Sequence, residues 1–105
     1  MSFAYGRCQF DGPYKKIEDL VNLPGIYVIL SIKNDKLKVL NVGYTKHIRK
    51  TVEEETFASF SNYRQKNQLY YGCNYNTTKQ PADLKKMAKE LQHHLSKNQT
   101  KEVRE

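Results

Sequence analysis

Residues 23–50, LPGIYVILSIKNDKLKVLNVGYTKHIRK, decide the fold that this sequence predicts. Two apolar, β-branched segments, residues 26–32 and 37–42, are separated by a short polar segment, and this arrangement is typical of a β-hairpin. Each strand carries a glycine-bearing triplet, Gly-Ile-Tyr at residues 25–27 and Asn-Val-Gly at residues 41–43. The triplets occupy equivalent places on the two strands, so they could mark an active site, the remnant of one, or a plain hairpin.

Upstream of the hairpin, the spacing of apolar residues predicts a short helix over residues 14–21. Ile17, Leu20 and Val21 stand at i, i+3 and i+4, which places them on one helical face. The apolar residues within residues 1–12 follow no clear period, and glycines interrupt the segment, so we predict a loosely ordered loop there.

Downstream of the hairpin, a second helix is predicted to begin soon after Gly43. Thr45 can accept its N-cap hydrogen bond, and Ile48 and Val52 supply its apolar face. Three consecutive glutamates, residues 53–55, fall within this helix. Because adjacent helical positions diverge, we interpret them as a solvated face rather than a metal cluster.

The second half of the chain predicts a third strand and a final helix. Residues 69–75 alternate and are rich in aromatic side chains, which suits a strand. Pro81 suits a first helical turn, and the helix after it has an apolar stripe that we assign to the core, made of Leu84, Met87, Ala88, Leu91 and Leu95. Residues 97–105 have little to bury, so we predict a frayed tail. The prediction is one α+β domain over residues 1–105, a small antiparallel three-stranded sheet flanked by helices in the order α-β-β-α-β-α.

The basic composition is compatible with a polyanionic partner, and the alternative interpretation is that the charge serves solubility. The chain has 105 residues, with 18 Lys and Arg against 11 Asp and Glu, a formal net charge of +7 and a sequence pI near 9.4. Residues 1–52 hold nine basic and four acidic side chains, so +5 of this charge lies with the first half. Cys8 and Cys73 have no ligand or redox spacing and are expected to be small buried residues. No run approaches the roughly 18 apolar residues of a membrane span, and no secretory signal is visible. We therefore predict a soluble, cytoplasmic protein with no membrane partner.

The two triplets and their surroundings resemble the GIY-YIG nuclease superfamily. The resemblance rests on LPGIYVI followed by a hairpin, on LNVGYTKHI opening a helix, and on the lead-in YKKIEDLVNLPGIY. It covers residues 14–60, and the strand and helix between residues 69 and 95 fit the remaining order. The resemblance implies metal-assisted phosphodiester hydrolysis, with Mg or Mn as the cofactor if the chain is active. Tyrosines and an arginine would come from the hairpin and the first long helix, and a glutamate on a later helix would hold the cation.

Carried over position by position, the resemblance is incomplete on the hairpin. Tyr27 matches the tyrosine of the first triplet and Gly43 matches the glycine of the second. Asn41 stands where the family has its second tyrosine, and an amide cannot act as a phenolate base. Tyr44 directly follows Gly43, and one residue along a strand points to the opposite face, so Tyr44 could replace the missing tyrosine only if Gly43 permitted a bulge.

The helical positions depart from the family as well. The family's arginine falls on Thr51, whereas Arg49 is turned about 200° away from that face. Glu90 is the glutamate that the predicted final helix offers for the metal, and its polar neighbours predict a solvated charge. His93 and His94 diverge by about 100° and have no third ligand, so no metal ligand is predicted.

Basic residues near the triplets are the candidates for contact with nucleic acid. The spacing between Tyr27 and Asn41 implies an extended hairpin arm, which could reach a phosphate backbone. The helix N-terminus after the second strand also favours an anion. The candidates are Lys46, His47 and Lys50 at the helix N-terminus and Lys33, Lys36 and Lys38 on the arm.

Three functions follow as hypotheses. The first is a GIY-YIG-like domain that has lost cleavage and binds nucleic acid. The second is an active endonuclease that depends on a divalent metal, in which Arg49, Tyr44 and one glutamate take over. The third is a protein-interaction module that uses a tyrosine-rich surface. Losing one preorganised transition-state donor costs about 2.7 to 4 kcal/mol, so the missing groups favour the first hypothesis over the second.

Overall fold

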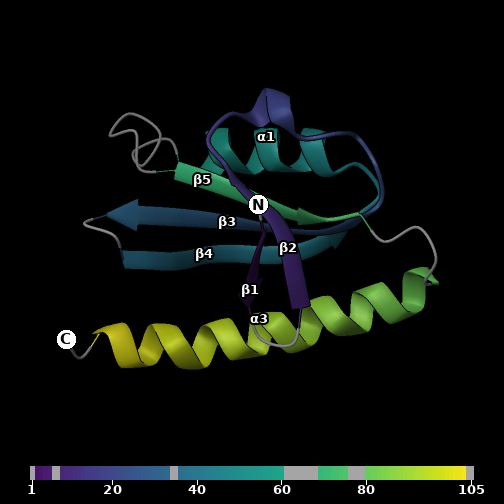
Figure 1. Ribbon diagram of the computed structural model, residues 1–105. Coiled ribbons are helices and arrows are strands. Elements are labelled where there is room, and N and C mark those ends of the chain that lie inside the picture. The colour runs from purple at the N-terminus through teal and green to yellow at the C-terminus, as the bar shows by residue number, and fades with distance from the viewer. Residues whose placement is uncertain (1, 6–7, 34–35, 61–68, 76–79, 104–105) are drawn as a thin grey trace.

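A computed structural model describes residues 2–5, 8–33, 36–60, 69–75 and 80–103 of the chain. The elements in chain order are β1 (Ser2–Tyr5), β2 (Cys8–Tyr14), the 3₁₀ helix η1 (Ile17–Asp19), β3 (Gly25–Lys33), β4 (Lys36–Thr45), α1 (Ile48–Ser59), β5 (Leu69–Asn74) and α3 (Pro81–Val103). The strands form one antiparallel sheet in the order β1-β2-β5-β3-β4, with α1 on one face and α3 on the other (Figure 1).

The predicted hairpin is confirmed, and it forms one side of the sheet. Strands β3 and β4 pair from Gly25 opposite Thr45 to Lys33 opposite Lys36, with Tyr27 opposite Gly43. On its other edge β3 pairs with β5, so the strand predicted over residues 69–75 lies next to β3 and not at the end of the sheet.

Strand β3 is apolar along its length because both of its faces are buried. Ile26, Val28 and Leu30 belong to a cluster on one face, and Tyr27 and Ile29 belong to a cluster on the other. A strand that is covered on both faces needs no polar alternation, which explains the nearly continuous hydrophobic run in the sequence.

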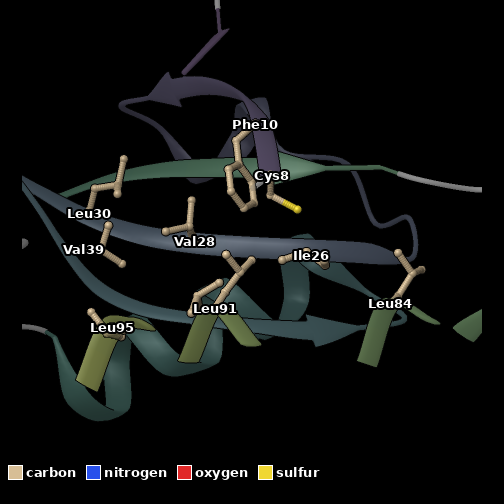
Figure 2. Packing of buried hydrophobic residues seen from close by; sticks show 10 residues of the cluster. Cys8, Phe10, Ile26, Val28, Leu30, Val39, Leu84, Leu91 and Leu95 are labelled. Atoms are coloured by element: carbon tan, nitrogen blue, oxygen red, sulfur yellow. The ribbon is translucent and has the colours of Figure 1, made fainter. Parts of the chain in front are cut away.

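Two hydrophobic cores therefore lie on opposite faces of the sheet. The first, which we call the α3 core, contains the α3 residues Leu84, Leu91 and Leu95 packed on β3 and β4 (Figure 2). The second, the α1 core, contains Ile48 and Val52 from α1 packed on the reverse face. The apolar stripe predicted for the final helix is confirmed as core, with Ala88 also buried and Met87 partly buried.

The predicted loop over residues 1–12 is wrong for the part of it that the structure describes. Residues 2–5 form β1, and β2 begins at Cys8. Cys8 and Phe10 are buried while Gln9 and Asp11 are exposed, which is the period of two expected of a half-buried strand. This alternation of buried and exposed residues is short because β2 then passes through Gly12, where φ is 118°. The pairing of β2 with β5 is also irregular between Asp11 and Tyr14.

The helix predicted over residues 14–21 is also wrong. Tyr14 is the last residue of β2, and only Ile17–Asp19 adopt a helical turn, of the 3₁₀ type. Ile17 and Leu20 are buried as the spacing predicts, but Val21 is 52% exposed. The α+β class is thus confirmed, whereas the three-stranded sheet and the order α-β-β-α-β-α are not, since β1 and β2 add two strands before η1 and extend the sheet beyond β5.

The structure also tests the predicted C-terminal tail and the predicted burial of the two cysteines. The helix α3 continues to Val103, so its backbone is helical through residues 97–103, where a frayed tail was predicted. Cys8 and Cys73 are both buried, as predicted. Among the described residues, no helix has both the length and the apolar character needed to cross a membrane.

Replacing Phe10 by Ala tests whether the N-terminal strands are part of the core. Phe10 is 1% exposed, and its ring stacks on Phe3 with centroids 5.5 Å apart. We expect Phe10→Ala to lower the free energy of unfolding by about 3 to 5 kcal/mol, measured by urea denaturation. The exposed neighbour Gln9→Ala should change it by no more than about 0.5 kcal/mol. Equal, small effects of both substitutions would mean that β2 contributes no core.

Candidate functional site

Three polar side chains from different elements meet on the α1 face of the sheet. The Tyr27 hydroxyl on β3 donates to Glu55 Oε1 at 2.7 Å, and Asn41 Nδ2 on β4 donates to Glu55 Oε2 at 2.8 Å. One carboxylate on α1 therefore receives a phenol and an amide, one on each oxygen. We call these residues the Tyr27–Asn41–Glu55 cluster.

An irregularity in β4 turns Asn41 toward α1. The pairing of β3 with β4 shifts between Ile29 and Leu30, whose partners are Asn41 and Val39, so Leu40 is an extra residue. Val39 and Val42 pack in the α3 core, whereas Leu40 packs in the α1 core. Such a bulge places two consecutive side chains on one face, and it allows Asn41 to follow Leu40 toward Glu55.

Gly43 leaves the space in which the Tyr27 ring lies. Tyr27 and Gly43 are directly opposite in the hairpin, and a Cβ built on Gly43 would stand 2.8 Å from the Tyr27 hydroxyl oxygen. Any side chain at position 43 would push the ring away from Glu55. The two triplets of the sequence therefore depend on each other sterically.

Glu55 was missed by the sequence analysis, which assigned residues 53–55 to a solvated face. Glu53 and Glu54 are indeed exposed, but Glu55 is partly buried against the sheet. The spacing in the sequence could have identified Glu55, because it lies seven residues after Ile48 and three after Val52, both of which are completely buried. A charged residue in register with the apolar face of a helix faces the core and needs donors there.

Thr51, which stands where the resemblance implies an arginine, makes a polar contact with Thr45. Thr51 Oγ1 lies 2.6 Å from Thr45 Oγ1, so this face of α1 is turned toward the end of β4. Arg49 is exposed, and no bond connects it to the Tyr27–Asn41–Glu55 cluster. The structure thus brings Tyr27 and Asn41 together, but Arg49 does not join them.

The N-terminus of α1 is capped from outside the helix. The backbone N–H of Ile48 donates to the Leu23 carbonyl at 3.2 Å, and the N–H of Lys50 donates to Asn22 Oδ1 at 2.9 Å. Thr45, predicted as the N-cap, instead accepts from the N–H of His47 at 3.1 Å, just before the helix begins. Because two of the first N–H groups are occupied, this helix N-terminus offers fewer donors to an anion than the sequence predicts.

Two other residues considered in the sequence lie on the opposite face of the sheet from Tyr27. Tyr44 packs against the α3 core, as expected from its place on β4. Glu90 is exposed on α3, the helix that covers the α3 core. Neither can approach the Tyr27 hydroxyl without crossing the sheet.

The environment of Tyr27 keeps its hydroxyl protonated. Burial raises the pKa of Tyr27 above its ordinary value of 10.0, and the hydrogen bond to Glu55 and the charge of that carboxylate raise it further. A phenol whose pKa is raised is a poor general base near neutral pH. In this arrangement Tyr27 acts as a hydrogen-bond donor.

Of the residues predicted to contact nucleic acid, those at the start of α1 lie on the surface. Lys46, His47 and Lys50 are exposed, and Arg49 is exposed between them. On the hairpin arm Lys38 is exposed, while the side chains of Lys33 and Lys36 lie outside the described residues. Within the described part of the chain, no group of three or more His, Cys, Asp or Glu could hold a metal ion.

Comparison with protein-family models, with curated proteins and with solved structures finds no match to this chain.

Replacing Glu55 by Gln tests the pairing within the cluster, with Glu54→Gln as the matched control. A carboxylate accepts on both oxygens and carries a charge, whereas a neutral amide accepts on one oxygen, so the Tyr27 hydroxyl would have to turn round and accept from the new NH₂ group, or else face it as a second donor. We expect Glu55→Gln to lower the free energy of unfolding by about 1 to 3 kcal/mol. Glu54→Gln is exposed and should stay within about 0.5 kcal/mol of the parent protein. Indistinguishable unfolding curves for the two variants would contradict the cluster.

Replacing Tyr27 by Phe tests the raised pKa through alkaline stability. Because the folded state holds this proton more tightly than the unfolded state, the stabilisation is complete below pH 10 and is lost as pH rises toward the folded value. We therefore expect the free energy of unfolding of the parent protein to fall above pH 10, and Tyr27→Phe to fall less steeply. Parallel curves for the two proteins, recorded by denaturation between pH 8 and 11.5 (roughly the range that brackets the ordinary value), would refute the assignment.

Proposed function

We propose that this chain is a GIY-YIG-like domain that binds nucleic acid and does not cleave it. The observation that carries the proposal is the hydrogen bond from Tyr27 to Glu55. This bond holds the hydroxyl of Tyr27, the tyrosine of the first triplet, on a carboxylate of α1. The resemblance implies that the same hydroxyl would instead act on a phosphodiester.

The electrostatics of the cluster support the absence of cleavage. A transferring phosphoryl group accumulates negative charge, which cations stabilise and a neighbouring carboxylate opposes. Glu55 brings such a carboxylate next to Tyr27, and the two donors that hold it are neutral. Burial, the hydrogen bond to Glu55 and the charge of that carboxylate all raise the pKa of Tyr27, which opposes formation of a phenolate.

The surface around the start of α1 supports binding. Three cationic side chains, Lys46, Arg49 and Lys50, are exposed within five residues and lie on the half of the chain that carries +5 of the net charge. Since the backbone N–H groups of Ile48 and Lys50 are already bonded, phosphates would be held by side chains. Binding of this kind depends strongly on salt, because each phosphate contact releases counterions.

The test is affinity for nucleic acid as a function of salt concentration. Labelled duplex DNA and single-stranded RNA would be titrated with the parent protein and with Lys46→Ala/Lys50→Ala. We expect binding by the parent protein, with log K falling as log salt rises, and a slope that is smaller by about 2 in the double variant. The matched control is Lys85→Ala/Lys89→Ala, which removes the same charge from exposed positions on α3 and should leave more of the affinity.

Three outcomes would contradict the proposal. Binding to neither probe at low salt would remove nucleic acid as the partner. Equal losses in the two double variants would show a response to net charge with no defined surface. Nicking of supercoiled plasmid in Mg²⁺ or Mn²⁺ that disappears in Tyr27→Phe would replace the proposal with an active endonuclease.

A further inference from the structure

A continuous set of hydrogen bonds connects α3 to the Tyr27–Asn41–Glu55 cluster across the outer edge of the sheet. Gln92 Nε2 on α3 donates to the Val42 carbonyl at 2.8 Å, and the Val42 N–H donates to Asn41 Oδ1 at 2.9 Å. The other end of the Asn41 side chain donates to Glu55. Two helices on opposite faces of the sheet are thereby connected through two neighbouring strand residues, Val42 and Asn41.

The place of Val42 in the sheet explains why side chains bond its backbone. Strand β4 is the last strand in the order of the sheet and, within the described part of the chain, pairs with β3 alone, so none of the described strands lies along its outer edge (Figure 1). Unpaired N–H and C=O groups on such an edge need other partners or water. At Val42 both groups are bonded by side chains, one from the neighbouring residue and one from α3.

The same bonds set the direction of the Asn41 amide. The oxygen and the NH₂ group of an asparagine side chain lie on opposite sides of one carbon, so fixing one fixes the other. With Oδ1 held by the Val42 N–H, Nδ2 must point toward Glu55. The Val42 carbonyl, held by Gln92, belongs to the peptide unit shared with Gly43, the residue over which the Tyr27 ring lies.

We propose that Gln92 is a positioning residue for the Tyr27–Asn41–Glu55 cluster, acting from α3 through the backbone of Val42. It holds the edge of β4 so that Asn41 presents its amide to Glu55. The role requires a donor at position 92, and it does not depend on whether the chain binds nucleic acid.

The experiment compares four substitutions, Gln92→Ala among them, by ¹⁵N NMR of the full chain. Gln92→Glu keeps the size of the side chain but has no N–H to donate, Gln92→Lys keeps a donor, and Glu90→Gln is an exposed control on the same helix. The readouts are the hydrogen-exchange rate of the Val42 amide, that of the Val28 amide in the centre of the sheet, and the Asn41 side-chain NH₂ resonances.

We expect Gln92→Glu to speed exchange at Val42 by about fivefold to tenfold while Val28 stays within about twofold, because one net hydrogen bond is lost locally. The Asn41 NH₂ resonances should move toward those of a free asparagine. Gln92→Lys and Glu90→Gln should resemble the parent protein. Gln92→Ala repeats the loss of the donor without adding a charge, and it should match Gln92→Glu.

Three results would overturn the inference. An unchanged Val42 rate and unchanged Asn41 resonances in both Gln92→Glu and Gln92→Ala would show that the α3 contact does not position the cluster. Acceleration by the same factor at Val42 and Val28 would show that Gln92 contributes only to global stability, and so would an equal effect of Glu90→Gln.

Discussion

Strand β3 has a paired strand on each edge and a hydrophobic core on each face, so every side chain from Ile26 to Leu30 must fill one of two interiors. The pleat of the strand sends Tyr27 to the α1 face, between Ile26 and Val28 on the other. That direction brings its hydroxyl beneath α1 and over Gly43. The position of the candidate site is thus a consequence of burying β3 on both faces.

A carboxylate inside this arrangement is stable only because the hairpin supplies its donors. Removing a carboxylate from water without hydrogen bonds costs several kcal/mol, whereas bonds to a charged group contribute about 1.5 to 3 kcal/mol each. Tyr27 and Asn41 give Glu55 one donor on each oxygen. A tyrosine in place of Asn41 would supply a hydroxyl but would lose the oxygen that accepts from the Val42 N–H. Asn41 therefore suits both the edge of β4 and the carboxylate.

At the positions where the GIY-YIG resemblance implies catalytic residues, this chain has groups of different chemistry. Thr51 bonds Thr45 where an arginine is implied, and Glu90 lies on α3, on the far side of the sheet from Tyr27. The acid that reaches Tyr27 comes from α1 instead. These differences underlie the proposal that binding is retained without cleavage, with the exposed cations at the start of α1 as the contact surface.

The sequence by itself determined the hairpin, the strand over residues 69–75, the helix with Ile48 and Val52 and the stripe of the final helix, because each is encoded in local periodicity. It also identified Tyr27, Asn41 and Gly43 as related positions. Only the tertiary structure decided that β1 and β2 join the sheet, that β5 lies next to β3, and that Glu55 and Gln92 converge on β4. Those features depend on pairings between distant segments, which no local pattern of residues specifies.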